Sequence, residues 1–105
     1  MNNNMKSIKQ TIFGKKYKLL IAKTPKQKTK GMNIFSSCPK QVGMIFSYDS
    51  EQTNRTFHMK KTPFPLKIIF LDKFNNIVYQ EIGNRYQSKP IICKKPSMTV
   101  IEIPV

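Results

Sequence analysis

Residues 57–72 read FHMKKTPFPLKIIFLD and contain the clearest strand signal in the chain. Their second half, KIIFLD, is rich in the β-branched and aromatic residues that favour a buried strand. Pro63 and Pro65 stand directly before it. Because proline fixes φ and keeps the preceding residue extended, the chain arrives at the sheet already extended. We expect three apolar side chains of this stretch in the core: Phe57, Met59 and Leu66.

Further apolar runs of strand length lie on both sides of this stretch. Residues 7–13 and 17–22 are separated by Gly14, Lys15 and Lys16, a spacing typical of a hairpin. Other runs occupy 43–46, 56–59, 77–82, 91–93 and 98–103, and the polar residues 48–54 read as a connection. This pattern predicts a mainly β fold, a small single-domain sandwich or barrel (jelly-roll-like) over residues 1–105 with a flexible lead at 1–6.

One short surface helix is predicted near residues 25–30. Thr24 is a good N-cap, Pro25 suits the first helical position, and Gln27 completes a capping box with Thr24. Gly31 ends the helix after about two turns. The body of the helix is almost entirely polar, so we expect it on the surface.

Charge is the strongest compositional signal. Lysine and arginine total 19 against 5 acidic residues, for a net charge of +14. The first thirty residues hold nine lysines and no acid. This excess predicts attraction to a polyanion such as nucleic acid, or to an acidic protein. The alternative is a merely basic, solvated surface, because the preference for lysine over arginine is typical of an AT-rich bacterial, viral or phage genome.

Basic residues alternate with aromatic ones in three places, around 15–18, 58–61 and 84–89. Aromatic rings can stack on bases while lysines contact phosphates. The shortage of arginine favours nonspecific phosphate contacts over base reading. The residues of this predicted nucleic-acid surface are Lys15, Lys16, Tyr17, Lys18, Lys60, Arg85 and Tyr86.

Catalytic and metal-binding residues are scarce. The two cysteines, Cys38 and Cys93, are far apart in sequence, and His58 is the single histidine, so we predict no metal site, no cofactor and no enzyme activity. A disulfide between the cysteines is not expected inside a cell. No segment reaches the ~18 apolar residues of a membrane span, and residues 1–10 do not resemble a secretory signal. These features predict a cytoplasmic protein, in the host cell if the chain is viral.

Four ordered motifs resemble the uncharacterised family known as domain of unknown function 192. They are TPKQKTKGM at 24–32, VGMIFSY at 42–48, FHMKKTPFPLKIIFLDKFNNIV at 57–78 and VIEIP at 100–104. The family has a Thr-Pro-led helix ending in Gly-Leu-Met, a Gly-Met-Leu-Phe strand, the motif Phe-Trp-Met-x-Asn-Thr-x-x-Pro-Leu-Asp and a Leu-Glu-(Leu/Val)-Pro element. The resemblance covers about residues 17–105, without the family's Gly-rich C-terminal segment. It implies a β-rich, jelly-roll-like domain with no established activity.

The polar positions depart from the family pattern. His58 stands where the family has Trp, Lys61 where it has Asn, and Lys67 where it has Asp, whereas Glu102 matches the family's Glu. These four residues are the candidate rim of a ligand site, in which we expect Glu102 to pair with Lys61 or Lys67. The sequence therefore predicts a non-enzymatic binding or accessory module. Nonspecific nucleic-acid binding through a lysine-rich face is the alternative.

Overall fold

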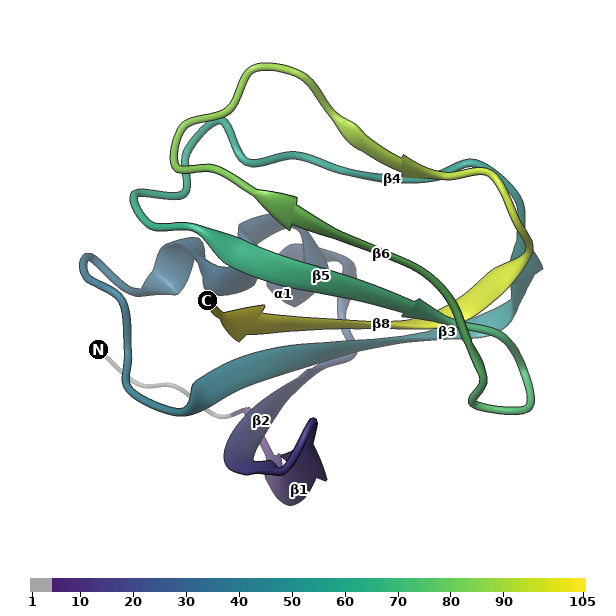
Figure 1. The fold of residues 1–105 in the computed structure, drawn as a ribbon, viewed down its shortest axis with the longest axis horizontal. Coiled ribbons are helices and arrows are strands. Elements are labelled where there is room, and N and C mark those ends of the chain that lie inside the picture. The colour runs from purple at the N-terminus through teal and green to yellow at the C-terminus, as the bar shows by residue number, and fades with distance from the viewer. Residues whose placement is uncertain (1–4) are drawn as a thin grey trace.

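The computed structural model describes residues 5–105, which form eight strands and two short helices. Figure 1 shows their arrangement. In chain order the elements are β1 (Ser7–Ile12), β2 (Lys15–Ala22), α1 (Pro25–Lys30), the 3₁₀ helix η1 (Gly31–Ile34), β3 (Val42–Gln52), β4 (Arg55–Phe57), β5 (Leu66–Leu71), β6 (Ile77–Gly83), β7 (Ile91–Cys93) and β8 (Ser97–Pro104).

Six of the strands form one mixed sheet in the order β1-β2-β3-β8-β5-β6, and β4 pairs with β7 separately. The pairing of β2 with β3 is parallel, because α1 and η1 carry the chain from one to the other, and the remaining pairs are antiparallel. The β1–β2 turn consists of Phe13 and Gly14, both at positive φ (49° and 79°), as expected for a tight hairpin.

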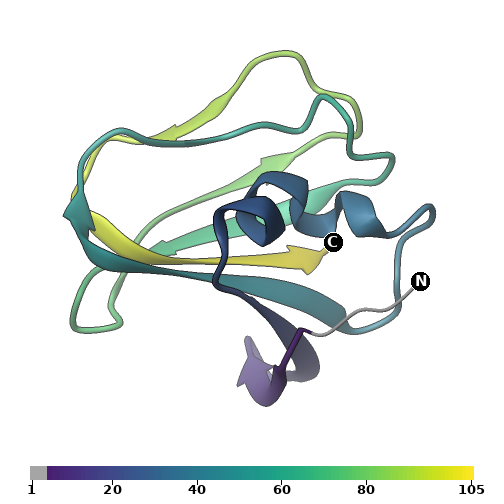
Figure 2. The same cartoon turned by 180° about the vertical axis from the view of Figure 1, so that it is seen from behind.

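The main core lies on the face of the sheet that α1, η1 and the β4–β7 pair cover (Figures 1 and 2). Met44 and Phe46 of β3, Ile68 and Phe70 of β5, and Val100 of β8 project into it. Met32 of η1 and Ile91 and Cys93 of β7 close it from the other side. The molecule is therefore a sandwich-like β structure and not a closed barrel, which confirms the predicted fold class.

The opposite face of the sheet carries a second, smaller apolar cluster. It consists of Tyr17, Leu19, Ile69, Ile101 and Ile103. Ile12 of β1 packs against this cluster, because the β1–β2 hairpin bends over this face. Strand β8 thus contributes Val100 to the main core and Ile101 and Ile103 to the smaller cluster, so it has buried apolar side chains on both faces.

The helix at Pro25–Lys30 confirms the capping-box prediction: Gln27 N–H donates to Thr24 Oγ1 over 3.1 Å, and Thr24 N–H donates to Gln27 Oε1 over 3.1 Å. The connection predicted at 48–54 was wrong, because β3 continues to Gln52. The polar end of β3 stays extended because its pairing with β8 resumes at Gln52 and Ser97, after an irregularity in the register.

The N-terminal lead falls partly outside the described residues, namely at positions 1–4. Within the described part of the lead, the Lys6 carbonyl accepts a hydrogen bond from Ile21 N–H over 2.8 Å. Between residues 5 and 105, the helices are all too short and too polar to cross a membrane.

Candidate functional site

A hollow of about 280 Å³ opens between the helical segment and the main core, and we call it the Glu102 pocket. Residues 28–33 of α1 and η1 form one wall, and β3, β4 and the loop after β4 form the others. Glu102 reaches it from β8. The lining consists of Lys28, Thr29, Lys30, Gly31, Met32, Asn33, Phe46, Tyr48, Thr56, Phe57, His58, Thr62 and Glu102.

The strand register determines the direction of Glu102. In β8 it pairs with Met44 of β3 and Ile68 of β5, both of which belong to the main core. Ile101 and Ile103 face the smaller cluster on the other side. Glu102 therefore projects toward the main core and the pocket, on the side that an apolar residue would normally occupy.

Glu102 is buried, and its carboxyl has no partner in the part of the chain that the structure describes. The residue is 4% exposed, and among residues 5–105 its carboxyl makes no hydrogen bond or ion pair. Burial raises the pKa of Glu102 from 4.5 to about 8, because removal from water disfavours the charged form. Around neutral pH the carboxyl is therefore mainly protonated and has both a donor and an acceptor to offer.

Gly31 brings the backbone close to this carboxyl. Its φ of 53° is strained for residues that have a side chain, and a Cβ built on it would lie 3.8 Å from Glu102 Oε1. The same residue ends α1, since its N–H donates to the Gln27 carbonyl. The chain turn that stops the helix thus also forms part of the pocket wall.

Tyr48 lies between two cations beside the pocket. The Lys28 ammonium is 4.1 Å from the centre of its ring, and the Arg55 guanidinium is 3.7 Å from it. Burial raises the pKa of the Tyr48 hydroxyl, which stays protonated at neutral pH. At the edge of the pocket, Thr62 Oγ1 donates to Asn33 Oδ1 over 2.6 Å and links the loop after β4 to η1.

The structure brings together two of the four predicted rim residues. His58 and Glu102 line the same pocket. Lys61 is exposed and does not line it, and Lys67 is on the opposite face of the sheet, where its ammonium is 4.3 Å from the centre of the Phe13 ring. The expected ion pair of Glu102 with Lys61 or Lys67 is absent from the described residues, because Lys67 pairs with Ile103 and shares its face.

The predicted nucleic-acid residues are divided between the two edges of the sheet. Lys15, Lys16 and Lys18 are exposed on β2, next to the edge strand β1, whereas Tyr17 is 8% exposed and packs in the smaller cluster. Lys60, Arg85 and Tyr86 lie in the loops after β4 and β6, near the other edge. Tyr86 N–H donates to the Thr62 carbonyl over 3.0 Å, which holds these two loops together. Tyr17 therefore has little ring surface free for stacking.

The cysteines are unpaired: Cys38 is exposed and Cys93 is buried in the main core. Cys38 lies near Lys15 and Lys40, away from the pocket that contains His58. Within the part of the chain that the structure describes, no group of three or more His, Cys, Asp or Glu residues could hold a metal ion.

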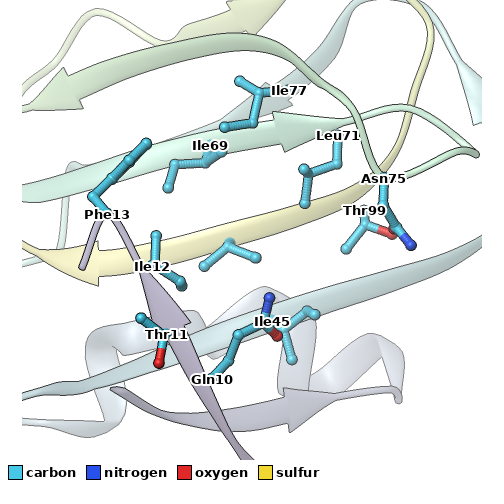
Figure 3. A pocket seen from close by; sticks show the side chains of 11 residues that line it. Gln10, Thr11, Ile12, Phe13, Ile45, Ile69, Leu71, Asn75, Ile77 and Thr99 are labelled. Atoms are coloured by element: carbon cyan, nitrogen blue, oxygen red, sulfur yellow. The ribbon is translucent and has the colours of Figure 1, made fainter. Parts of the chain in front are cut away.

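A second hollow, of about 430 Å³, lies on the opposite face of the sheet. Figure 3 shows Ile12 and Phe13 of the hairpin around it, with Ile69 and Leu71 of β5 on the sheet. Gln10, Thr11, Asn75 and Thr99 supply its polar atoms, and none of its described lining residues is ionisable. This groove is an uncovered part of an apolar sheet face, whereas the Glu102 pocket contains a titratable group.

The sequence did not single out Gly31, Asn33, Tyr48 or Thr62 as pocket residues. Gly31 and Thr62 belong to the motifs shared with the family, and this is the signal that could have pointed to them. Tyr48 is the last residue of the VGMIFSY motif, whereas Asn33 lies outside the four motifs and meets the pocket only through the packing of η1.

Comparison with known families agrees with the motifs. The model of the family DUF192, described as Uncharacterized ACR, matches residues 7–105. The chain belongs to this family. No curated protein matches the chain. In this DUF192 chain, Gly31 and Glu102 meet inside the pocket, whereas His58 lies exposed in its lining.

Two solved structures share the fold of this DUF192 chain. A protein of unknown function from Novosphingobium aromaticivorans has a TM-score of 0.76 and 24% identity, over 95% of this chain and 73% of that one. A proposed transcription regulator from Sinorhizobium meliloti has a TM-score of 0.73 and 22% identity, over 92% of this chain and 77% of that one. At these identities the likeness extends to the fold alone.

Proposed function

We propose that the chain is a non-enzymatic binding module whose ligand is a small molecule held in the Glu102 pocket. One observation carries the proposal: Glu102 is almost fully buried, its carboxyl has no hydrogen-bond or ion-pair partner among residues 5–105, and it reaches a hollow. Among the described residues no fully buried side-chain oxygen or nitrogen lacks a hydrogen-bond partner, so the Glu102 oxygens, which make no hydrogen bond, are accessible from the hollow. A ligand in the hollow can therefore form a hydrogen bond with this carboxyl.

The composition of the pocket supports binding over turnover. Among its described lining residues, Glu102 is the single carboxyl and there is no cysteine, so neither a carboxylate pair nor a thiol nucleophile is available. His58, the other candidate for proton transfer, is exposed. Tyr48 is held by Lys28 and Arg55, which suits a rigid recognition wall.

The binding module is tested by two-dimensional amide NMR with a mixed panel of small anionic, cationic and neutral compounds. We expect at least one class to shift the amides of residues 28–33 and 56–58 in the wild type, and to shift them less in Glu102→Ala. Lys9→Ala, on the exposed β1 strand, is the matched control and should behave as wild type. A hydrolase substrate panel completes the test. Turnover that His58→Ala or Cys38→Ala abolishes would show an enzyme instead.

Nonspecific nucleic-acid binding is the second candidate, and the exposed lysines of β2 together with the +14 charge favour it. It is tested by fluorescence polarisation with a single-stranded oligonucleotide at ~50 mM salt. Binding tighter than micromolar that weakens in Lys15→Gln/Lys16→Gln/Lys18→Gln, and not in Glu102→Gln, would support this candidate. We expect weaker binding, because the predicted residues are split into two groups near opposite edges of the sheet.

A further inference from the structure

The charges around the Glu102 pocket are one-sided. Lys28 and Lys30 of α1 line it, and Arg55 of β4 lies behind Tyr48. His58 lines it from the loop after β4, and Glu102 is the single acid in the described lining. The whole chain carries +14, so its long-range field also attracts anions. These lysines would repel a cationic ligand.

The Glu102 carboxyl also favours an anionic ligand. With its pKa raised to about 8 by burial, it is mainly neutral at pH 7 and can donate its proton to an acceptor. A hydrogen bond from a neutral carboxyl to a carboxylate is charge-assisted, short and stronger than one between neutral groups. A cation would require Glu102 to ionise where burial disfavours the charge.

The rest of the lining suits an apolar ligand body. Met32, Phe46 and Phe57 present apolar surface, and Phe46 and Phe57 stack edge to face with ring centres 5.0 Å apart. The volume of about 280 Å³ limits the occupant to a small molecule.

Building on the proposed function, we infer that the Glu102 pocket binds small molecules that carry one carboxylate on an apolar body. The protonated carboxyl of Glu102 donates a hydrogen bond to the ligand carboxylate, and Lys28 and Lys30 neutralise its charge at the mouth. Binding then requires the Glu102 proton, and the ligand loses affinity when Glu102 ionises.

The test uses three probes of matched shape: benzoate, benzamide and benzylammonium. Each is titrated into the wild-type protein at pH 6.5 and at pH 9, and the amides of residues 28–33 and 56–58 are followed by NMR. We expect benzoate to bind tightest at pH 6.5 and about tenfold weaker at pH 9, where roughly one Glu102 in ten keeps its proton. Benzylammonium should bind weakest at pH 6.5.

Two variants separate Glu102 from the other titrating groups. Glu102→Gln keeps a hydrogen-bond donor and cannot ionise. Its benzoate affinity should therefore equal that of the wild type at pH 6.5 and should not fall tenfold at pH 9. His58→Gln removes the exposed imidazole, and the fall should remain. Equal benzoate affinity at both pH values in the wild type, or a preference for benzylammonium, would overturn the inference while the pocket stands as a ligand site. If none of the three probes shifts the pocket amides, the inference is overturned, and the mixed panel described above decides whether the pocket binds any small molecule.

Discussion

Gly31 stands against the Glu102 carboxyl, so that a side chain at position 31 would project toward it. A Cβ at Gly31 would be 3.8 Å from Glu102 Oε1 and 3.6 Å from Phe46 Cζ. Both are ordinary contact distances, which means that an alanine would touch the pocket without a clash. The glycine is needed for its backbone, at a φ of 53°.

Gly31→Ala should therefore lower the free energy of unfolding by about 1–3 kcal/mol, because a φ of 53° with a ψ of −143° is strained for any residue that has a side chain. It should also narrow the pocket and change the environment of the Glu102 carboxyl. Urea denaturation measures the first effect, and the ¹³C resonance of the Glu102 carboxyl measures the second.

Gly14→Ala is the matched control. Gly14 has a φ of 79°, and a Cβ there would meet nothing within 4 Å. This variant should lose a similar amount of stability and leave the Glu102 resonance unchanged. The role given to Gly31 is wrong if both variants shift that resonance equally, or if neither does.

The raised pKa of Glu102 predicts a pH dependence of stability. The folded chain keeps this proton up to about pH 8, whereas the unfolded chain loses it near the ordinary value of 4.5. Between these values the folded state binds more protons, so the contribution of Glu102 to stability is full below about pH 4.5 and declines as the pH rises toward 8. The expected slope is about 1.4 kcal/mol per pH unit.

Glu102→Gln isolates this contribution, because an amide does not titrate. Urea denaturation at pH 5.5 and 7.5 should show the wild type losing about 3 kcal/mol relative to the variant over that interval. Parallel stability curves for the two proteins would mean that Glu102 titrates normally in the folded state. A carboxyl ¹³C titration of the folded wild type reads the same pKa directly.

Local signals in the sequence predicted the helix correctly, and they predicted the hairpin with its connection at 14–16, whereas the turn is at 13–14. The capping box of Thr24 and Gln27 acts over three residues, and the Gly14 turn acts over two, so neither depends on the rest of the fold. The far end of β3 could not be predicted in this way. Gln52 is extended because it pairs with Ser97, which lies 45 positions along the chain.

The relative positions of the four predicted rim residues could not be read from the sequence for a related reason. Alternation along 98–103 placed Glu102 opposite Ile101 and Ile103, but both faces of the sheet are apolar, so the alternation did not say which face holds the main core. Lys67 was assigned to the side of Glu102, whereas pairing with Ile103 places it on the other one. Burial of Glu102 among residues from α1, η1 and β4 became visible only in three dimensions.

The helix cap provides a test of the pocket wall. Thr24→Ala removes the acceptor for Gln27 N–H and should cost about 1 kcal/mol of stability, because an N-cap hydrogen bond is lost. Thr53→Ala, at an exposed turn position, is the matched control and should change little. Urea denaturation measures the free energy of unfolding of both variants. Equal stability of the two would show that the cap does not stabilise α1.

Arg55 holds β4 to its neighbours from inside the protein. Its guanidinium donates to Ser97 Oγ at 3.3 Å, to the Ser97 carbonyl at 3.0 Å and to the Ser50 carbonyl at 3.2 Å. It also covers the ring of Tyr48. Arg55→Ala should therefore lower the free energy of unfolding by about 2–4 kcal/mol, since it removes a buried side chain and leaves these acceptors unpaired.

The other arginine of the chain supplies the control. Arg85 is exposed in the loop after β6. Arg85→Ala truncates the same type of side chain at an exposed position and should change the free energy of unfolding very little. Arg55→Lys keeps the charge, but a single ammonium cannot reproduce the planar fork that contacts Ser50 and Ser97 together, so it should be intermediate. Equal unfolding free energies for Arg55→Ala and Arg85→Ala would show that the buried guanidinium does not stabilise the fold. An Arg55→Lys variant as stable as the wild type would show that charge alone suffices at this position.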